Sequence, residues 1–166
     1  MPVNKDFEEL FHLLNFVQAK YLVVGAYAVI FHTEPRYTKD IDIWVQPDSR
    51  NADRVYRALR RFGAPLKDLT IGDLKKPTTV YQIGVEPNRI DILTGISGVS
   101  FDDAWRRRKK DYYGHENISL LHLKDLIKAK KASGRKQDLL DLEVLSKAAD
   151  GKTRKKRHKI SIETRK

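Results

Sequence analysis

The sequence contains no cysteine among its 166 residues, and it has one methionine and two tryptophans. Without cysteine the chain has no disulfide, no thiol nucleophile and no cysteine ligand for zinc. It also lacks any run of about 18 apolar residues, the length that a membrane-spanning helix needs. Residues 1–9 are polar and acidic, which is unlike a secretory signal peptide. These absences favour a cytoplasmic protein held together by its core rather than by cross-links.

The charge of the chain is strongly basic and unevenly distributed. Lysine and arginine number 33 against 22 aspartates and glutamates, which gives a net charge of +11. Residues 152–166 hold eight basic residues and one acid, so +7 lies there and +4 in the remainder. A run of like charge with few apolar residues is typical of a disordered segment. We therefore predict a domain over residues 1–150 and a basic tail over residues 151–166. The tail either contacts RNA or another acidic partner, or is simply solvated.

A second basic run, Arg106 to Lys110, lies inside the predicted domain beside Trp105 and Tyr112. Basic groups next to aromatic rings suit single-stranded nucleic acid, which makes this run a second candidate RNA contact. A solvated helix end is the alternative interpretation of the same pattern.

Hydrophobic periodicity predicts helices and strands that alternate along the chain. The predicted helices cover residues 6–20, 26–32, 49–62 (with Ser49 as the N-cap), 103–110, 120–133 and 137–149. The predicted strands cover residues 21–24, 41–45, 79–85, 89–94 and 116–119. Residues 79–94 form a hairpin in this prediction, because a short Pro/Asn turn separates the two strands. The pattern indicates a mixed α/β fold, with helices packed on a sheet.

Three aspartates occupy unusual positions in the predicted strands. Asp40 and Asp42 are two residues apart, so both side chains point to one face of their strand. Asp91 stands between two isoleucines in another strand. If the two strands are neighbours, the three carboxylates converge on one face of the sheet. Oxygen ligands of this kind suit Mg²⁺ or Mn²⁺, and such a cluster can hold two ions for an in-line phosphoryl displacement.

An alternative interpretation of the three acids needs no metal. Asp40 and Asp42 would face solvent at the edge of a strand, and Asp91 would pair with Arg89 or Arg36. The segment Val24-Gly25-Ala26 favours the metal site, because there a buried strand breaks into a helix through a glycine. Small residues at such a junction let backbone N–H groups approach phosphate oxygens.

The ordered set Val24-Gly25-Ala26, Asp40-Ile41-Asp42 and Asp91 resembles the nucleotidyltransferase superfamily, whose fold is that of the DNA polymerase β palm. Residues 36–42 and 130–141 are similar to small bacterial and archaeal nucleotidyltransferases, which include toxins of toxin–antitoxin systems. The resemblance covers residues 21–145. It implies a polymerase β-like mixed sheet flanked by helices, with a helical C-terminal part.

The resemblance also implies roles for individual residues. Asp40, Asp42 and Asp91 would be the catalytic and metal-binding residues. The nucleotide-binding residues would be Gly25, Ala26, Arg36, Lys130 and Arg135.

Each of the implied basic residues has a structural alternative, and one implied turn residue departs from the family pattern. Arg135 could pair with Asp138 or Asp141, and Arg36 with Asp40 or Asp91. Ala26 occupies a position where the family usually has glycine or serine, so it supplies no hydroxyl for a phosphate oxygen.

The resemblance implies a metal-dependent enzyme that moves a nucleotide from a nucleoside triphosphate to an acceptor hydroxyl. The acceptor would be RNA such as tRNA, a protein or a small molecule, and the toxin-type members imply an antitoxin partner. The alternative is a catalytically degenerate module of the same fold that binds nucleotide or RNA. The five histidines show no metal-ligand spacing, and the serines lack a matching His/Asp set, which excludes serine hydrolase chemistry.

Overall fold

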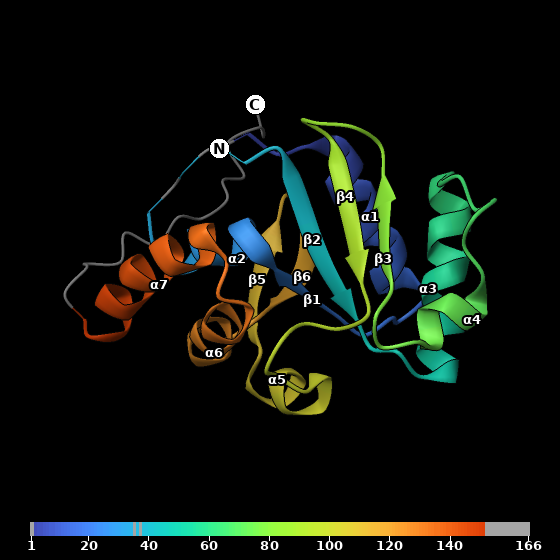
Figure 1. Ribbon diagram of the computed structural model, residues 1–166. Helices are drawn as coiled ribbons and strands as arrows, with labels where there is room; N and C mark the ends of the chain where they lie inside the picture. Colours follow the sequence, from blue (N-terminus) through green and yellow to red (C-terminus); the bar gives the residue numbers. More distant parts are fainter. Residues whose placement is uncertain (1, 35, 37, 152–166) are drawn as a thin grey trace.

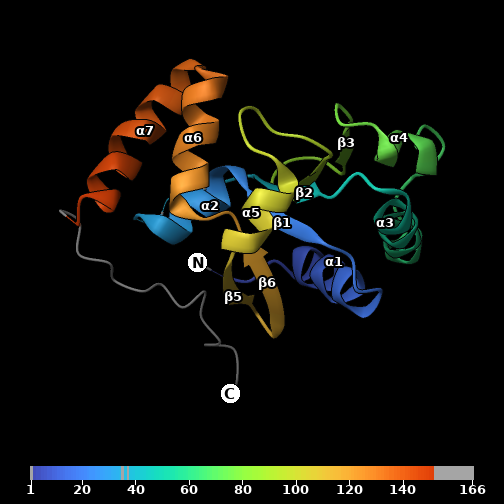
Figure 2. The same cartoon turned by 90° about the horizontal axis from the view of Figure 1, so that it is seen from below.

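A six-stranded mixed sheet forms the centre of the computed structural model, which describes residues 2–34, 36 and 38–151 (Figures 1 and 2). The strands are β1 (Tyr21–Val24), β2 (Asp40–Val45), β3 (Val80–Ile83), β4 (Arg89–Leu93), β5 (Lys109–Tyr113) and β6 (Glu116–Leu120). Their spatial order is β3-β4-β2-β1-β6-β5. β1 runs antiparallel to β2, β2 is parallel to β4, and β1 is parallel to β6. The predicted α/β class is confirmed.

Helices cover both faces of this sheet. They are α1 (Lys5–Phe16), α2 (Gly25–His32), α3 (Ser49–Phe62), α4 (Ile71–Lys75), α5 (Phe101–Arg107), α6 (Leu123–Ser133) and α7 (Lys136–Ala149). Figures 1 and 2 show α1 and α3 on one side and α2, α6 and α7 on the other.

Alternation along the strands divides the core between these two sides. Ile41 and Ile43 of β2 are buried with α1 and α3, whereas Trp44 packs with α2, α5 and α6. Because successive side chains point to opposite faces, Asp40 and Asp42 share the second face with Trp44. The acids therefore lie under α6 and α7.

Several helix bounds differ from the sequence prediction. α1 ends at Phe16 rather than at residue 20, and α6 begins at Leu123 because residue 120 is the last of β6. Asp48, not Ser49, is the N-cap of α3, because its side chain accepts a hydrogen bond from Asn51 N. α4 was not predicted, since it is only five residues long; its N-terminus is held by reciprocal hydrogen bonds between Thr70 and Asp73.

The predicted helix over residues 103–110 is wrong at its C-terminal end. α5 ends at Arg107, and Lys109–Tyr113 forms β5, which pairs antiparallel with β6. Arg108 is the C-cap of α5, and its guanidinium lies 3.9 Å above the ring of Trp105. A run of basic residues gives no periodic signal that separates a helix end from an edge strand.

The basic tail at residues 152–166 lies outside the described residues, so its predicted RNA contact stays a prediction. In the described part of the chain, no helix combines the length and apolarity that a membrane crossing requires.

Candidate active site

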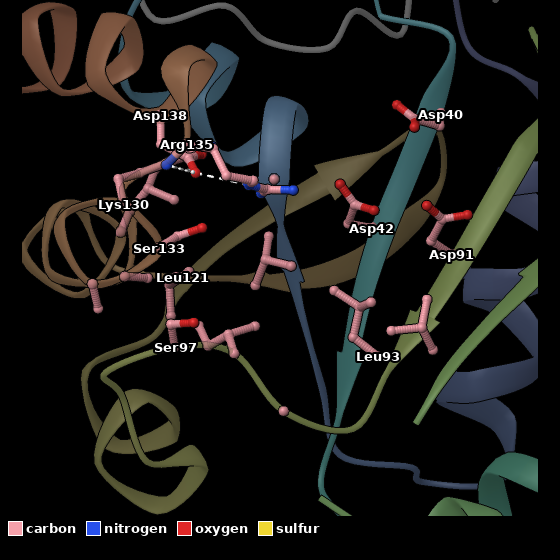
Figure 3. A pocket seen from close by; sticks show the side chains of 18 of the residues that line it. Asp40, Asp42, Asp91, Leu93, Ser97, Leu121, Lys130, Ser133, Arg135 and Asp138 are labelled. Atoms are coloured by element: carbon pink, nitrogen blue, oxygen red, sulfur yellow. Dashed lines mark hydrogen bonds and ion pairs between the residues drawn. The ribbon is translucent and has the colours of Figure 1, made fainter. Parts of the chain in front are cut away.

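Asp40, Asp42 and Asp91 converge on one face of the sheet (Figure 3). Parallel pairing of β2 with β4 places Asp42 directly opposite Asp91, and Asp40 opposite Arg89. One carboxylate oxygen from each aspartate lies within 4.8 Å of those of the other two. The predicted convergence is therefore confirmed, and its cause is the register of two strands that are 49 residues apart in the sequence.

Arg89 lies among these acids. Its Nη2 is 2.5 Å from Asp40 Oδ2, and its Nε is 3.1 Å from Asp91 Oδ1. Three carboxylates and one guanidinium leave a formal charge of about −2 if all the acids are ionised. The sequence suggests Arg89 only as a partner for Asp91, and the structure shows that contact. Its position two residues earlier on the same strand face was the signal that it belongs to the site.

Asp42 shows how the excess negative charge acts on the site. Burial, followed by the charges of Asp40 and Asp91, raises the pKa of Asp42 to about 7. A cation bound nearby would stabilise the ionised carboxylate of Asp42 and lower this pKa. The carboxylate oxygens and the charge deficit both fit a hard divalent ion such as Mg²⁺ or Mn²⁺.

Gly25 forms the floor of the site where β1 ends and α2 begins. Its φ of +65° is in the left-handed region, and a Cβ at this position would collide with Asp42 Oδ2. Only glycine combines this backbone conformation with this approach to a carboxylate. Gly25 lines the cavity, as predicted from its place at the turn. Ala26 is half-buried in the first turn of α2 and is not among the residues that line the cavity.

The three aspartates form one wall of a cavity of about 920 Å³. Lys130 of α6 and Arg135, at the α6–α7 junction, lie on the opposite wall (Figure 3). The wall opposite the acids, here called the basic wall, thus carries two cationic side chains together with Asp138, which pairs with both. Ser97 and Ser133 also line the cavity, and neither was singled out from the sequence.

Two buried aspartates of α7 hold the basic wall in place. Lys130 Nζ is 2.9 Å from Asp138 Oδ1 and 3.0 Å from Asp141 Oδ2, and Arg135 Nε is 2.9 Å from Asp138 Oδ2. Burial opposes ionisation of Asp138, but hydrogen bonds from Arg135 and Lys130 outweigh it and hold its pKa well below the usual range. The same balance, with Arg36 and Lys130 as donors, lowers the pKa of Asp141.

Arg36 lies apart from the acid cluster. Its Nη1 is 2.7 Å from Asp141 Oδ1, so Arg36 pairs with Asp141 and not with Asp40 or Asp91. It is not among the residues that line the cavity, so the contact that the structure shows for Arg36 is with α7. For Arg135 the structure shows the first of its two structural alternatives, the pairing with Asp138.

No protein-family model matches the sequence, and no curated protein matches it significantly. Solved structures do match its backbone. The lincosamide antibiotic adenylyltransferase LnuA, solved with lincomycin bound, superposes with a TM-score of 0.57 at 15% identity, covering 89% of this chain and 98% of LnuA. TM1012 of Thermotoga maritima, which has been assigned as a nucleotidyltransferase, superposes with a TM-score of 0.51 at 14% identity, covering 89% of this chain and 92% of that protein.

The fold is that of the nucleotidyltransferases. The comparisons thus confirm the fold that the resemblance implies, and they do not bear on the toxin-type subgroup. Within the nucleotidyltransferase fold of this chain, the acid cluster, the Gly25 turn and the basic wall all face one cavity.

Proposed function

We propose that the chain is a metal-dependent nucleotidyltransferase, which transfers a nucleoside monophosphate from a nucleoside triphosphate to an acceptor hydroxyl and releases pyrophosphate. One observation carries the proposal: three converging aspartates face two cationic side chains across a single cavity. Phosphoryl transfer depends mainly on positioning and on neutralising charge, and this cavity offers groups for both.

The acidic wall would hold the metal. Asp40, Asp42 and Asp91 are the ligands in this proposal, with Mg²⁺ or Mn²⁺ as the ion. When bound, such ions neutralise phosphate charge and orient the attacking and leaving oxygens. In the same proposal Asp91 would also help to activate the acceptor hydroxyl.

The remaining walls would hold the triphosphate. Gly25 has no side chain of its own at the turn into α2, and in this proposal the first N–H groups of α2 bind phosphate oxygens. Lys130 and Arg135 would contact phosphate oxygens from the opposite side, and Asp138 fixes where both cations point.

RNA, such as tRNA, is the acceptor that we favour, because the chain is strongly basic outside its acidic site. A protein hydroxyl and a small molecule are the other acceptors to be tested. LnuA is by name an adenylyltransferase of lincosamide antibiotics, so lincomycin belongs in the acceptor panel.

The deciding experiment supplies each α-labelled nucleoside triphosphate in turn, with Mg²⁺, to the full chain together with total RNA, a protein extract or lincomycin. We expect label in one acceptor class with one preferred base, and none with Asp42→Asn. Transfer that is unaffected by Asp42→Asn would exclude the metal assignment.

A role as the toxin of a toxin–antitoxin pair is a narrower form of the proposal. It predicts growth arrest when the chain is expressed alone, and no arrest with Asp42→Asn. Normal growth with active enzyme would exclude it.

The second candidate is a degenerate module that binds nucleotide or RNA without transfer. Two observations favour it: Ala26 stands at the turn, and Arg89 already contacts two of the three acids. Calorimetry with Mg²⁺-ATP and Mg²⁺-CTP separates the candidates. Metal-dependent binding without transfer to any acceptor would favour the degenerate module.

A further inference from the structure

A second cavity, of about 390 Å³, lies at the other end of β1 from Gly25. Its walls come from the turn between α1 and β1, the end of α5 and the β5–β6 hairpin, and they include Ala19, Trp105, Arg108, Lys110 and Ser119. Its volume is within the range of about 300–1,000 Å³ that is typical of ligand sites. Tyr21 lines this cavity and Val24 lines the first, and about 10 Å of strand separates these two residues at about 3.3 Å per residue.

The cations around the second cavity have no acidic partner among the described residues. In the described part of the chain, no ion pair involves Arg108, Lys110 or the neighbouring Lys20. By contrast, Arg106 is paired with Asp103 at 2.5 Å, and Arg107 with Asp125 at 2.7 Å. The basic run that is continuous in the sequence is thus divided by the fold. Its first part is neutralised, and its second part faces a cavity.

Trp105 supplies an aromatic surface between these cations. The guanidinium of Arg108 lies 3.9 Å from the centre of its ring, and Lys20 Nζ lies 5.6 Å from it. Arg108 Nη1 also donates a hydrogen bond to the carbonyl oxygen of Trp105 at 2.8 Å, which fixes the plane of the guanidinium. A flat guanidinium fixed over an indole ring is a platform on which a nucleobase stacks, while nearby lysines contact the phosphates.

We propose that this second cavity binds a nucleotide of a single-stranded RNA. Arg108 stacks on the base, and Lys20 and Lys110 contact the flanking phosphates. Asn117 and Ser119 also line the cavity, and their polar side chains can hydrogen bond a ribose 2′-hydroxyl, the group that distinguishes RNA from DNA. That the bound RNA is the acceptor of the transfer rests on the proposed function, whereas the binding itself does not.

The test measures RNA binding without transfer. The Asp42→Asn chain, without metal or nucleotide, is titrated into a labelled single-stranded RNA, and its fluorescence anisotropy is followed at several salt concentrations. We expect Arg108→Ala to weaken binding by about tenfold or more, as the loss of one stacked base does. Lys110→Ala should reduce the slope of log affinity against log salt by about one. Arg108→Lys keeps the charge but not the planar surface, so it should bind almost as weakly as Arg108→Ala.

Arg60 of α3 provides the matched control, because it is an exposed arginine outside the cavity. Arg60→Ala should change the affinity by less than about twofold. Equal losses in the Arg60 and Arg108 variants would show diffuse attraction to a basic surface and would overturn the site. Equal affinity for DNA of the same sequence would overturn the assignment to RNA.

Tryptophan fluorescence gives an independent readout. The chain has two tryptophans, so a Trp44→Phe variant reports on Trp105 alone. We expect its emission to change on saturation with RNA, and an unchanged emission would place the RNA elsewhere. If RNA binds as described but no transfer occurs, the proposed function fails and the site stands. If transfer occurs but the Arg108 variants bind RNA normally, the RNA site at the second cavity fails and the proposed function stands.

Discussion

Asp42 and Asp91 are directly paired across the parallel register of β2 and β4, with both carboxylates on the face of the sheet under α6. Two acids opposed in this way destabilise the strand pair unless a cation lies between them. Arg89 contacts Asp91 and Asp40, and for Asp42 burial and neighbouring charge raise the pKa to about 7. The fold thus tolerates repulsion at one point, and a divalent cation would relieve it.

The first prediction concerns the stability of the metal-free chain. Asp42→Asn removes one of the repelling charges, so we expect the free energy of unfolding at pH 8 without metal to rise by about 1–2 kcal/mol. That corresponds to a melting temperature higher by roughly 2–8 °C for a chain of this size. Transfer activity should be lost at the same time.

Asp53 supplies the control for that prediction, because it is exposed and pairs with Arg57 across one helical turn. Asp53→Asn should change the free energy of unfolding by less than about 0.5 kcal/mol and leave transfer intact. A lower melting temperature for Asp42→Asn, with transfer retained, would contradict both parts of the interpretation.

The second prediction concerns pH. The pKa of Asp42 is raised from 3.8 to about 7 in the folded chain. The folded state therefore holds this proton more tightly than the unfolded state. The resulting stabilisation of the metal-free chain is complete below pH 3.8 and is lost as the pH rises through 7. Divalent ions compete with the same proton, so Mg²⁺ should bind weakly at pH 6 and more tightly at pH 8.

Calorimetry at pH 6, 7 and 8 checks this competition. As the pH rises toward 7, the dissociation constant for Mg²⁺ should fall by up to about tenfold per pH unit. Above pH 7 it should level off. In buffers of different ionisation enthalpy, binding should release close to one proton at pH 6, about half a proton at pH 7 and almost none at pH 8. Mg²⁺ affinity that is equal at all three pH values would show that Asp42 is not a ligand.

The strand faces that Asp40, Asp42 and Asp91 occupy could be predicted from the sequence because two local rules set them. Their convergence was predicted only on the condition that the two strands are neighbours. Alternation along β2 places the first two acids on one face, and isoleucines on either side mark the buried strand that carries Asp91. The pairing of β2 with β4 then brings the three together. The role of Arg89 depends on that same register, which no local pattern specifies, so its contact with Asp40 could not be predicted.

The basic residues were harder to interpret because charge has no periodicity of its own. Arg106, Arg107 and Arg108 are adjacent in the sequence, but two are neutralised by acids of α5 and α6 and the third stacks on Trp105. Long-range contacts also explain Arg36, whose acid lies 105 residues away on α7.

The third prediction concerns Gly25. Gly25→Ala places a methyl group against Asp42 Oδ2 in a left-handed backbone conformation. We expect a loss of stability of about 2 kcal/mol or more, from strain plus collision, together with loss of nucleotide binding. Melting temperatures and calorimetry with Mg²⁺-ATP measure the two effects separately.

Gly63 is the matched control for Gly25. Its φ is +87°, but no neighbouring atom lies within 4 Å of a Cβ built there. Gly63→Ala therefore incurs only the conformational strain, about 1 kcal/mol, and should leave nucleotide binding unchanged. If both variants bind nucleotide as the parent chain does, the Gly25 turn is not a phosphate contact.

The fourth prediction separates two contributions of the basic wall, one to the stability of the fold and one to binding of the nucleoside triphosphate. Arg135 is mostly exposed, whereas its partner Asp138 has a side chain that is 1% exposed. Arg135→Ala should change the free energy of unfolding by less than about 1 kcal/mol, because the guanidinium is mostly solvated and Lys130 still pairs with Asp138. It should nevertheless raise the KM for the nucleoside triphosphate about tenfold, since a phosphate contact is lost.

Asp138→Asn should affect both stability and nucleotide binding, because this aspartate pairs with Lys130 as well as with Arg135. Breaking a buried pair costs roughly 3 kcal/mol or more, so the melting temperature should fall clearly. The KM should also rise, since the two cations lose the group that orients them. Mg²⁺ affinity measured without nucleotide should stay the same in both variants, because the acids of β2 and β4 are untouched. An altered Mg²⁺ affinity with normal KM would instead assign Arg135 and Asp138 to the acidic wall and contradict the division of the cavity.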